Sequence, residues 1–211
     1  MSNRKQDIID TAVRLFNEHG FYNVSLKEIA RELAISPGNL TYHFRRKDDL
    51  LMAIQEQLIE DASMPMMPDA LPGFVHLQAL QEAYHQNQIK YAFYFNNLLY
   101  IFRAYPEIAA RYRKVTEERL SQGRMLLEHY VDQDLLRVER NKGDYDSLIR
   151  VLWMTSVFWT GSDAVLEGVQ LEAARNNQKE VFWSLIRPHL TEKGLDAYNS
   201  LARNKPTISQ F

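Results

Sequence analysis

The segment from residue 25 to residue 47, SLKEIARELAISPGNLTYHFRRK, constrains this chain more than any other, because it carries the start signals of two short helices. Ser25 is followed three residues later by Glu28, which is the pattern of a capping box. Ser36 precedes Pro37, and a proline fits the first position of a helix, where no backbone donor is needed. The residues between these two starts leave room for a tight turn, so the segment predicts a helix-turn-helix.

The second predicted helix has an apolar side and a polar side. Leu40 and Phe44 lie at the spacing of one face and are expected to hold the helix to a core. The other positions carry small or polar groups that can reach base edges in a DNA major groove, and three cations follow directly, where phosphates would lie. This combination favours DNA binding. Capped helix pairs also occur in all-α proteins that bind no DNA, so spacing alone leaves both interpretations open.

Three phrases of the sequence are similar to those of a known family: LF-x-x-x-GF at 15–21, S-x-x-x-IA at 25–30 and S-x-G-x-L-x-x-HF-x-x-KDDL at 36–50. On these phrases, the first fifty or so residues closely resemble the DNA-binding domain of TetR-family transcriptional regulators. The resemblance covers roughly a quarter of the chain. The remainder matches the family only in length and helical character.

The resemblance implies roles for individual residues. Lys27 and Asn39 correspond to base contacts. Phosphate contacts are implied for Ser25, Tyr42, His43 and Lys47, with Arg45 and Arg46 assisting. The full predicted DNA-binding set is Ser25, Lys27, Ser36, Pro37, Gly38, Asn39, Thr41, Tyr42, His43, Arg45, Arg46 and Lys47. The family often has an aromatic residue in place of Thr41 and a polar one in place of Pro37, which leaves the recognised base sequence open.

Length and composition fit one DNA-binding module and one larger helical domain. The chain has 211 residues, 45% of them hydrophobic, and a formal net charge of −2. Residues 1–50 carry eight Lys and Arg against seven Asp and Glu, so local placement of cations, rather than bulk charge, must attract phosphates. The absence of cysteine excludes disulfides and thiolate chemistry. No signal peptide and no run of ~18 apolar residues is present, so we expect a cytoplasmic protein.

The expected domains are a helix-turn-helix domain at 1–47, a connecting helix at 48–62, a linker at 63–73 and a helical ligand-binding and dimerisation domain at 74–211. The linker, SMPMMPDALPG, contains three prolines and a glycine. No segment alternates with period two for long, so the predicted fold class is all-α. The predicted helices lie near 3–19, 47–62, 74–88, 90–104, 106–132, 144–168, 175–189 and 192–203.

Aromatic side chains are dense between residues 91 and 105. The consecutive Phe93, Tyr94 and Phe95 point in three directions around a helix, so one face cannot bury all the rings. Plain core, a cavity lining and contact with a second chain all stay open for them. In the resembled family this region holds the inducer, and an apolar pocket with a few polar groups suits a small ligand. The candidate ligand-binding residues are Tyr91, Phe95, Asn96, Tyr100, Arg103, His129 and Trp153.

The predicted helices at 144–168 and 175–189 are hydrophobic over most of their circumference, which indicates burial on more than one side. One side can face its own domain and the other a partner subunit, giving a four-helix bundle across a twofold axis. TetR-like regulators usually dimerise this way, and two recognition helices cover more base pairs than one. A hairpin buried within a monomer is the alternative. The candidate dimer contacts are Thr155, Phe158, Trp159, Ser162, Phe182 and Leu185.

Catalytic patterns are missing from the sequence. Its six histidines include no pair at the i,i+3 or i,i+4 spacing of a helical metal site, and no Gly-x-Ser-x-Gly phrase or phosphate-binding glycine loop occurs. We therefore expect no enzyme activity, no metal and no cofactor. The expected function is that of a regulator, in this family most often a repressor, that binds a palindromic operator as a homodimer and is released by a small, largely apolar ligand. The alternative is a helical ligand-binding or protein-interaction module without DNA-binding activity.

Overall fold

The computed structural model describes residues 4–63, 73–166 and 178–203. These residues form helices, turns and one isolated bridge between Leu136 and Leu190, with no strand among them, which confirms the all-α prediction. The chain divides into two compact units: unit 1 comprises residues 1–63 and 85–114, and unit 2 comprises residues 64–84 and 115–211. The predicted linker lies almost entirely outside the described residues, and the predicted domain limits stay predictions.

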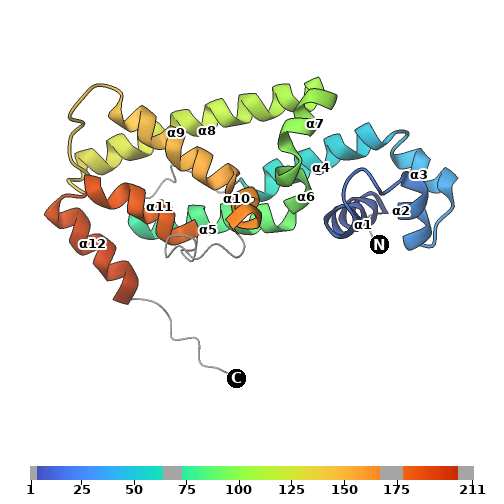
Figure 1. Ribbon diagram of the computed structural model, residues 1–211, viewed down its shortest axis with the longest axis horizontal. Helices are drawn as coiled ribbons and strands as arrows, with labels where there is room; N and C mark the ends of the chain where they lie inside the picture. Colours follow the sequence, from blue (N-terminus) through green and yellow to red (C-terminus); the bar gives the residue numbers. More distant parts are fainter. Residues whose placement is uncertain (1–3, 64–72, 167–177, 204–211) are drawn as a thin grey trace. The chain divides into compact units, whose positions relative to one another are not determined.

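Unit 1 begins with four helices and is completed by segments that come later in the chain (Figure 1). The first four are α1 (Arg4–His19), α2 (Leu26–Glu32), α3 (Pro37–His43) and α4 (Lys47–Asp61). The later ones are the end of α5 (Phe74–Lys90), then α6 (Ala92–Asn96), α7 (Leu98–Ala104) and the start of α8 (Pro106–Asp132). The bounds of α1, α4, α5 and α8 lie within two residues of the prediction, because apolar periodicity and Gly, Asp or Pro at the ends locate them.

The core of unit 1 comes from the apolar face of each of its first helices. Ile8 and Phe16 of α1, Ile29 of α2, Leu40 of α3 and Ile54 of α4 are almost completely buried. Side chains of this kind contribute about 1.5–3 kcal/mol each when removed from water. Since α2 and α3 are only seven residues long, this shared burial is what holds them in place.

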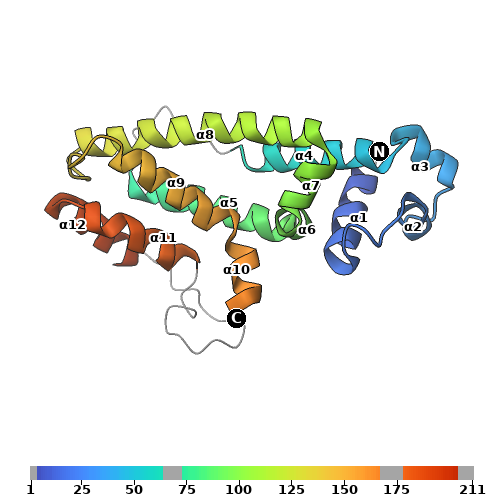
Figure 2. The same ribbon diagram turned by 45° about the horizontal axis from the view of Figure 1, so that its top comes forward.

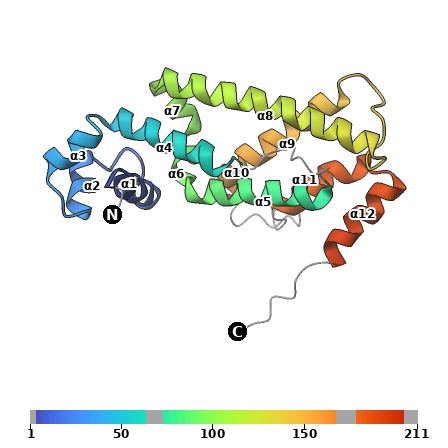
Figure 3. The same cartoon turned by 180° about the vertical axis from the view of Figure 1, so that it is seen from behind.

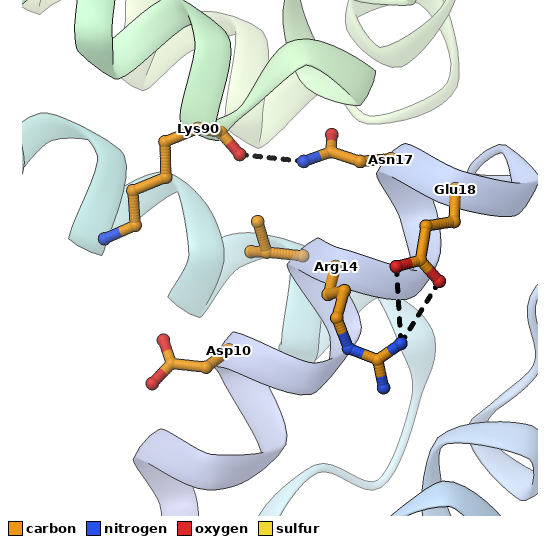
Figure 4. A pocket seen from close by; sticks show the side chains of 6 residues that line it. Asp10, Arg14, Asn17, Glu18 and Lys90 are labelled. Carbon is orange, nitrogen blue, oxygen red and sulfur yellow. Dashed lines mark hydrogen bonds and ion pairs between the residues drawn. The ribbon is translucent and has the colours of Figure 1, made fainter.

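The carboxyl-terminal part of α1 forms hydrogen bonds to the junction between α5 and α6. The side-chain amide of Asn17 donates to the Lys90 carbonyl at 2.9 Å and accepts from the Phe93 backbone N–H at 2.9 Å (Figure 4). A surface hollow of about 570 Å³ lies here, lined by Asp10, Val13, Arg14, Asn17, Glu18 and Lys90. Its two cations are ion-paired, Arg14 with Glu18 and Glu32, and Lys90 with Asp61.

The prediction of one helix at 90–104 is wrong, because the chain breaks at Asn97 between α6 and α7. The Asn97 amide donates to the Phe93 carbonyl at 2.7 Å and so competes with the backbone ladder of the helix. The prediction of one helix at 144–168 is also wrong within the described residues, since α9 (Asp144–Val157) ends at Phe158 and α10 (Trp159–Leu166) follows. Hydroxyls of Thr155 and Ser162 donate to carbonyls of their own helices here, a bond that bends helices.

Unit 2 contains the first part of α5, most of α8, α9, α10 and three further elements (Figure 2). These are α11 (Gln178–Ile186), a 3₁₀ turn (Arg187–His189) and α12 (Glu192–Arg203). Helices α9 and α11 contact each other, and the core beneath them is aromatic. The ring of Phe74 lies 5.3 Å from that of Trp183 and 5.2 Å from that of Tyr130, edge to face in both cases.

An ion-pair cluster fixes the turn between α8 and α9. Arg124 donates to both carboxylate oxygens of Glu139, at 2.6 and 3.1 Å, and to Glu128 at 2.8 Å. Glu139 also accepts the backbone N–H of Tyr145 at 2.7 Å. The Arg124 hydrogen bonds, and then that of Tyr145, lower the pKa of Glu139 to about 2.

This lowered pKa predicts a specific loss of stability in acid. Because the carboxylate is favoured in the folded state, its stabilising effect is complete above its ordinary pKa of 4.5 and is lost as pH falls from there towards about 2. Glu139→Gln should therefore lower stability at pH 7 and flatten the decline between pH 5 and pH 2, measured by urea unfolding. Glu128→Gln, on the same arginine, is the matched control. Equal slopes for wild type and Glu139→Gln would contradict this account.

Candidate DNA-binding site

Helix α2 starts at the predicted capping box. The Ser25 hydroxyl accepts the Glu28 backbone N–H at 3.3 Å, and the Glu28 carboxylate accepts the Ser25 N–H at 2.7 Å and its hydroxyl at 2.8 Å. These Ser25 donors lower the pKa of Glu28. Ile29 and Ala30 are buried, whereas Lys27 is exposed. The helix therefore presents Lys27 while its apolar side anchors it.

The turn and the start of α3 also follow the prediction. Ala34 adopts a left-handed backbone with φ of 52°, and the Ile35 N–H donates back to the Ala30 carbonyl at 3.0 Å. The Ser36 hydroxyl accepts the Asn39 N–H at 3.1 Å, with Pro37 in the first position of the helix. Helices α2 and α3 consequently lie side by side, and α4 begins directly after α3 (Figure 3).

The outward face of α3 consists of the residues predicted to read DNA. Leu40 and Phe44 are buried and fix the helix, while Ser36, Pro37, Gly38, Asn39, Thr41 and Tyr42 are exposed. Tyr42 is 85% exposed, and its ring meets that of His43 edge to face at 5.3 Å. The Thr41 hydroxyl donates to the Pro37 carbonyl at 3.0 Å, so its oxygen offers acceptor lone pairs at the surface.

The three cations after α3 have different surroundings. Arg45 is exposed and makes no ion pair with any described residue, and Arg46 is exposed near Asp48 and Asp49 at 3.8 and 3.7 Å. Lys47 is half-buried instead. Its ammonium donates to the Phe21 carbonyl and lies 4.2 Å from the centroid of that ring, and burial lowers its pKa.

Lys47 therefore binds the core of unit 1. It also lies 5.1 Å from the ring centroid of Phe16, and cation–π contacts of this kind hold an ammonium in place. An ammonium has three donors, so one bond to a carbonyl leaves others for a phosphate. Sequence reasoning missed a further cation, Lys5 of α1, whose ammonium lies 5.9 Å from the Phe44 ring at the end of α3. In the sequence, this cation is indicated by the neighbouring pair Arg4 and Lys5 at the start of α1.

The candidate ligand-binding residues do not share one environment. Tyr91 is fully buried and donates its hydroxyl to Asp61 at 2.6 Å, and Phe95 is buried. Tyr100 is half exposed, with its ring 4.5 Å from that of Tyr22. Asn96 and Arg103 are exposed in unit 1, whereas His129 and Trp153 are half-buried in unit 2. None of the seven lines the hollow beside α1.

The candidate dimer contacts also lie in different environments, some in the core of unit 2 and others at its surface. Phe182 belongs to the buried core of unit 2 and Leu185 packs against it, while Thr155, Trp159 and Ser162 are half-buried. Phe158 belongs to a row of exposed apolar side chains that we call the α9–α10 stripe: Val151, Met154, Phe158 and Val165. Val151, Met154 and the C-cap Phe158 are three and four residues apart and so follow one side of α9, whereas Val165 lies on α10, beyond the break. Val151, Met154 and Val165 were not among the predicted contacts, because their exposure depends on packing that sequence does not show.

Neither a metal site nor a membrane span is found among the described residues. No group of three or more His, Asp or Glu side chains there is arranged to hold a metal ion. None of the described helices has the length and the apolar character that crossing a membrane requires.

Two family models match the sequence. One, for bacterial regulatory proteins of the tetR family, covers residues 8–54, and the other, for a bacterial transcriptional repressor of the TetR type, covers residues 60–198. The transcriptional regulator HbdR of Aromatoleum is 33% identical over 73 residues, 35% of this chain and 31% of that protein. The regulator UidR of Escherichia coli is 45% identical over 47 residues, 22% of this chain and 24% of that protein. The chain thus matches less than a third of the length of these curated relatives.

Solved structures share the whole fold. A TetR-family transcriptional regulator from Marinobacter aquaeolei is 22% identical, with a TM-score of 0.83 over 98% of this chain and 100% of that one. A putative transcriptional regulator from Saccharomonospora viridis, solved with choline, is 20% identical, with a TM-score of 0.72 over 91% and 100% of the two chains. With one family model on the helix-turn-helix and a second over most of the remaining residues, this chain belongs to the TetR family of bacterial transcriptional regulators.

Proposed function

We propose that this regulator is a repressor that binds a palindromic operator as a homodimer and is released by a small, largely apolar ligand. The observation that carries the proposal is the outward face of α3, where polar side chains stay exposed because Leu40 and Phe44 hold the opposite face in the core. A short helix fixed in this way can enter a major groove without losing its own packing. Base contacts are assigned to Lys27 and Asn39.

Phosphate contacts complete the DNA-binding site in this proposal. They are assigned to Ser25, Tyr42, His43, Arg45, Arg46 and Lys47, which lie at the N-cap of α2, at the end of α3, between α3 and α4, and at the start of α4. The amino-terminal end of α4 adds a favourable helix dipole for a phosphate. Since the net charge is −2, these local groups supply the attraction.

The α9–α10 stripe supports the homodimer. Four large apolar side chains exposed on the consecutive helices α9 and α10 are costly to leave in water, and a second copy of the same stripe is a complementary cover across a twofold axis. In a dimer, two α3 helices would reach successive major grooves ~34 Å apart.

Ligand release requires that the ligand bind two arrangements of the protein with different affinity. A coupling of a few kcal/mol is sufficient to release DNA. In this proposal the ligand binds in the carboxyl-terminal helical part and shifts α4, which directly follows the DNA-binding helices, and so changes the spacing of the two α3 helices.

The proposal is tested by selecting the purified protein against a random duplex library at near-physiological salt. Enrichment of two inverted half-sites is the expected result. A folded protein that retains no duplex, at low salt as well, would contradict DNA binding and favour an interaction module. Retention without any enriched sequence, weakening steeply with salt, would contradict the palindromic operator while keeping phosphate binding.

Asn39→Ala should weaken binding at a single base position. The amide can form two hydrogen bonds to one base, so its loss should cost roughly 1–3 kcal/mol for the selected duplex and leave non-specific affinity unchanged. Binding to a set of duplexes with each half-site base changed in turn measures this. Asn23→Ala is the control, because the Asn23 amide donates within unit 1 to the His19 carbonyl at 2.9 Å. A uniform loss over all duplexes would contradict the assignment.

Lys47→Ala should lower both the salt dependence of DNA binding and the stability of the fold. Loss of one phosphate contact reduces the slope of log affinity against log salt by ~1. Stability falls as well, because the ammonium is held by Phe21 and Phe16. Arg45→Ala, at an exposed position, should change the slope alone. An unchanged slope for Lys47→Ala would assign this lysine to the core only.

Met154→Glu should weaken the dimer, because it places a charge within the α9–α10 stripe. We expect at least a tenfold rise in the dimer dissociation constant, equivalent to about 1.4 kcal/mol, measured by sedimentation velocity. Val138→Glu, at a more exposed apolar position outside the stripe, is the matched control and should change nothing. A dimer equally stable in both variants would exclude the stripe from the interface.

A further inference from the structure

Helix α4 buries one polar side chain among its apolar ones. Gln55 is only 1% exposed, and its neighbours on the helix, Leu51, Ile54 and Leu58, are buried as well. An amide removed from water destabilises a fold unless its hydrogen bonds are replaced. A buried glutamine on this helix therefore needs partners of fixed geometry.

Gln55 has such partners on two other helices of unit 1. Its side-chain nitrogen donates to the Tyr94 hydroxyl of α6 at 3.0 Å and to the Ile108 carbonyl of α8 at 2.8 Å. Both hydrogens of the amide are thus used, each on a different element. Because both partners are buried, water does not compete for these bonds.

Two further polar contacts continue along α4. The Leu58 carbonyl accepts the Asn87 amide at 2.9 Å, and Asp61 accepts from the Lys90 ammonium at 2.7 Å and the Tyr91 hydroxyl at 2.6 Å. Residues 55, 58 and 61 are three apart, so they follow one side of the helix. We call these contacts the α4 polar ladder. It joins α4 to α5, α6 and α8.

The α4 polar ladder favours one register of α4 over registers shifted along or around the helix axis. Apolar contacts are non-directional, whereas a hydrogen bond weakens steeply when its length or angle changes. A shift of α4 by one turn would break the ladder, whereas the apolar side chains of residues 50, 54 and 58, which are four apart, would largely take one another's places. The chain passes from α3 into α4 through only three residues, so the position of α4 sets that of α3.

We propose that Gln55 is a positioning residue for DNA binding: its amide fixes the register of α4 against α6 and α8, and thereby the place of α2 and α3. It makes no contact with DNA. The proposal rests on DNA binding by a dimer, in which a small displacement of each α3 changes the distance between the two half-sites that the protein accepts.

The test uses four full-length variants. Gln55→Met removes the amide at similar size and leaves the Tyr94 hydroxyl without its Gln55 partner, so thermal stability should fall. Tyr94→Phe removes that hydroxyl. The double variant Q55M/Y94F replaces both partners by apolar groups, which is often nearly neutral, so stability should largely recover. Gln57→Met is the matched control, because Gln57 lies on the same helix and accepts from Gln6 of α1 at 2.8 Å.

The position of α2 relative to α8 is measured separately from thermal stability and without DNA. The chain has no cysteine, so Arg31→Cys on α2 and Arg113→Cys on α8, both exposed positions of unit 1, introduce two unique sites for spin labels. Pulsed electron resonance on labelled protein diluted with unlabelled protein gives their distance within one chain. We expect a narrow distribution for the parent and for Gln57→Met, and a clearly broader one for Gln55→Met and for the double variant.

DNA binding supplies the second measurement. On a duplex selected by the wild type, insertion of one base pair between the half-sites should weaken wild-type binding far more than binding by the double variant. We expect this discrimination to fall by about tenfold, which corresponds to 1.4 kcal/mol. If the double variant recovers the narrow distance distribution together with its stability, Gln55 is merely structural and the proposal is overturned. If the wild type selects no duplex, the proposed function fails, and the distance distributions alone decide the role of Gln55.

Discussion

The structure depends on satisfying the backbone of two helices that are too short to be stable alone. Helices α2 and α3 have seven residues each, and a helix of that length has few internal hydrogen bonds to offset the cost of its ends. Ser25 and Ser36 cap the ends with side-chain oxygens, and burial of Ile29 and Leu40 supplies the remaining stability. Because the start of α3 is capped and its apolar face is buried, its polar side chains can stay exposed to solvent without destabilising the helix.

Sequence predicted these features because they are local. A cap, its partner three residues on and the apolar face between them lie within one short window, and the helix bounds in unit 1 follow from them. Two helix breaks, at Asn97 and near Phe158, were not predicted from the sequence. At both places a side-chain amide or hydroxyl group forms a hydrogen bond to a helix carbonyl. Residues of these types also occur inside unbroken helices, so composition alone does not reveal the break.

The rest of the site depends on contacts between distant segments. Lys47 was predicted at a phosphate, and nothing in its neighbourhood along the chain shows that its ammonium lies over Phe21. Phe182 and Met154 have similar hydrophobic surroundings in sequence, yet the first is core and the second is exposed. The partners of Gln55 are 39 and 53 residues away. Periodicity identifies which side of a helix is apolar, but it does not identify what covers that side.

The contacts of α4 and α1 bear on how such a protein changes over evolution. The Gln55, Asn87 and Asn17 amides each donate to a main-chain carbonyl, of Ile108, Leu58 and Lys90 respectively. A carbonyl is present whatever side chain its residue carries, so the accepting positions can mutate without losing the bond. Sequence identity with the curated relatives covers only 22–35% of the chain, while a solved structure matches over 98% of it at 22% identity. A fold joined through main-chain acceptors therefore keeps these hydrogen bonds when the side chains of the accepting residues change.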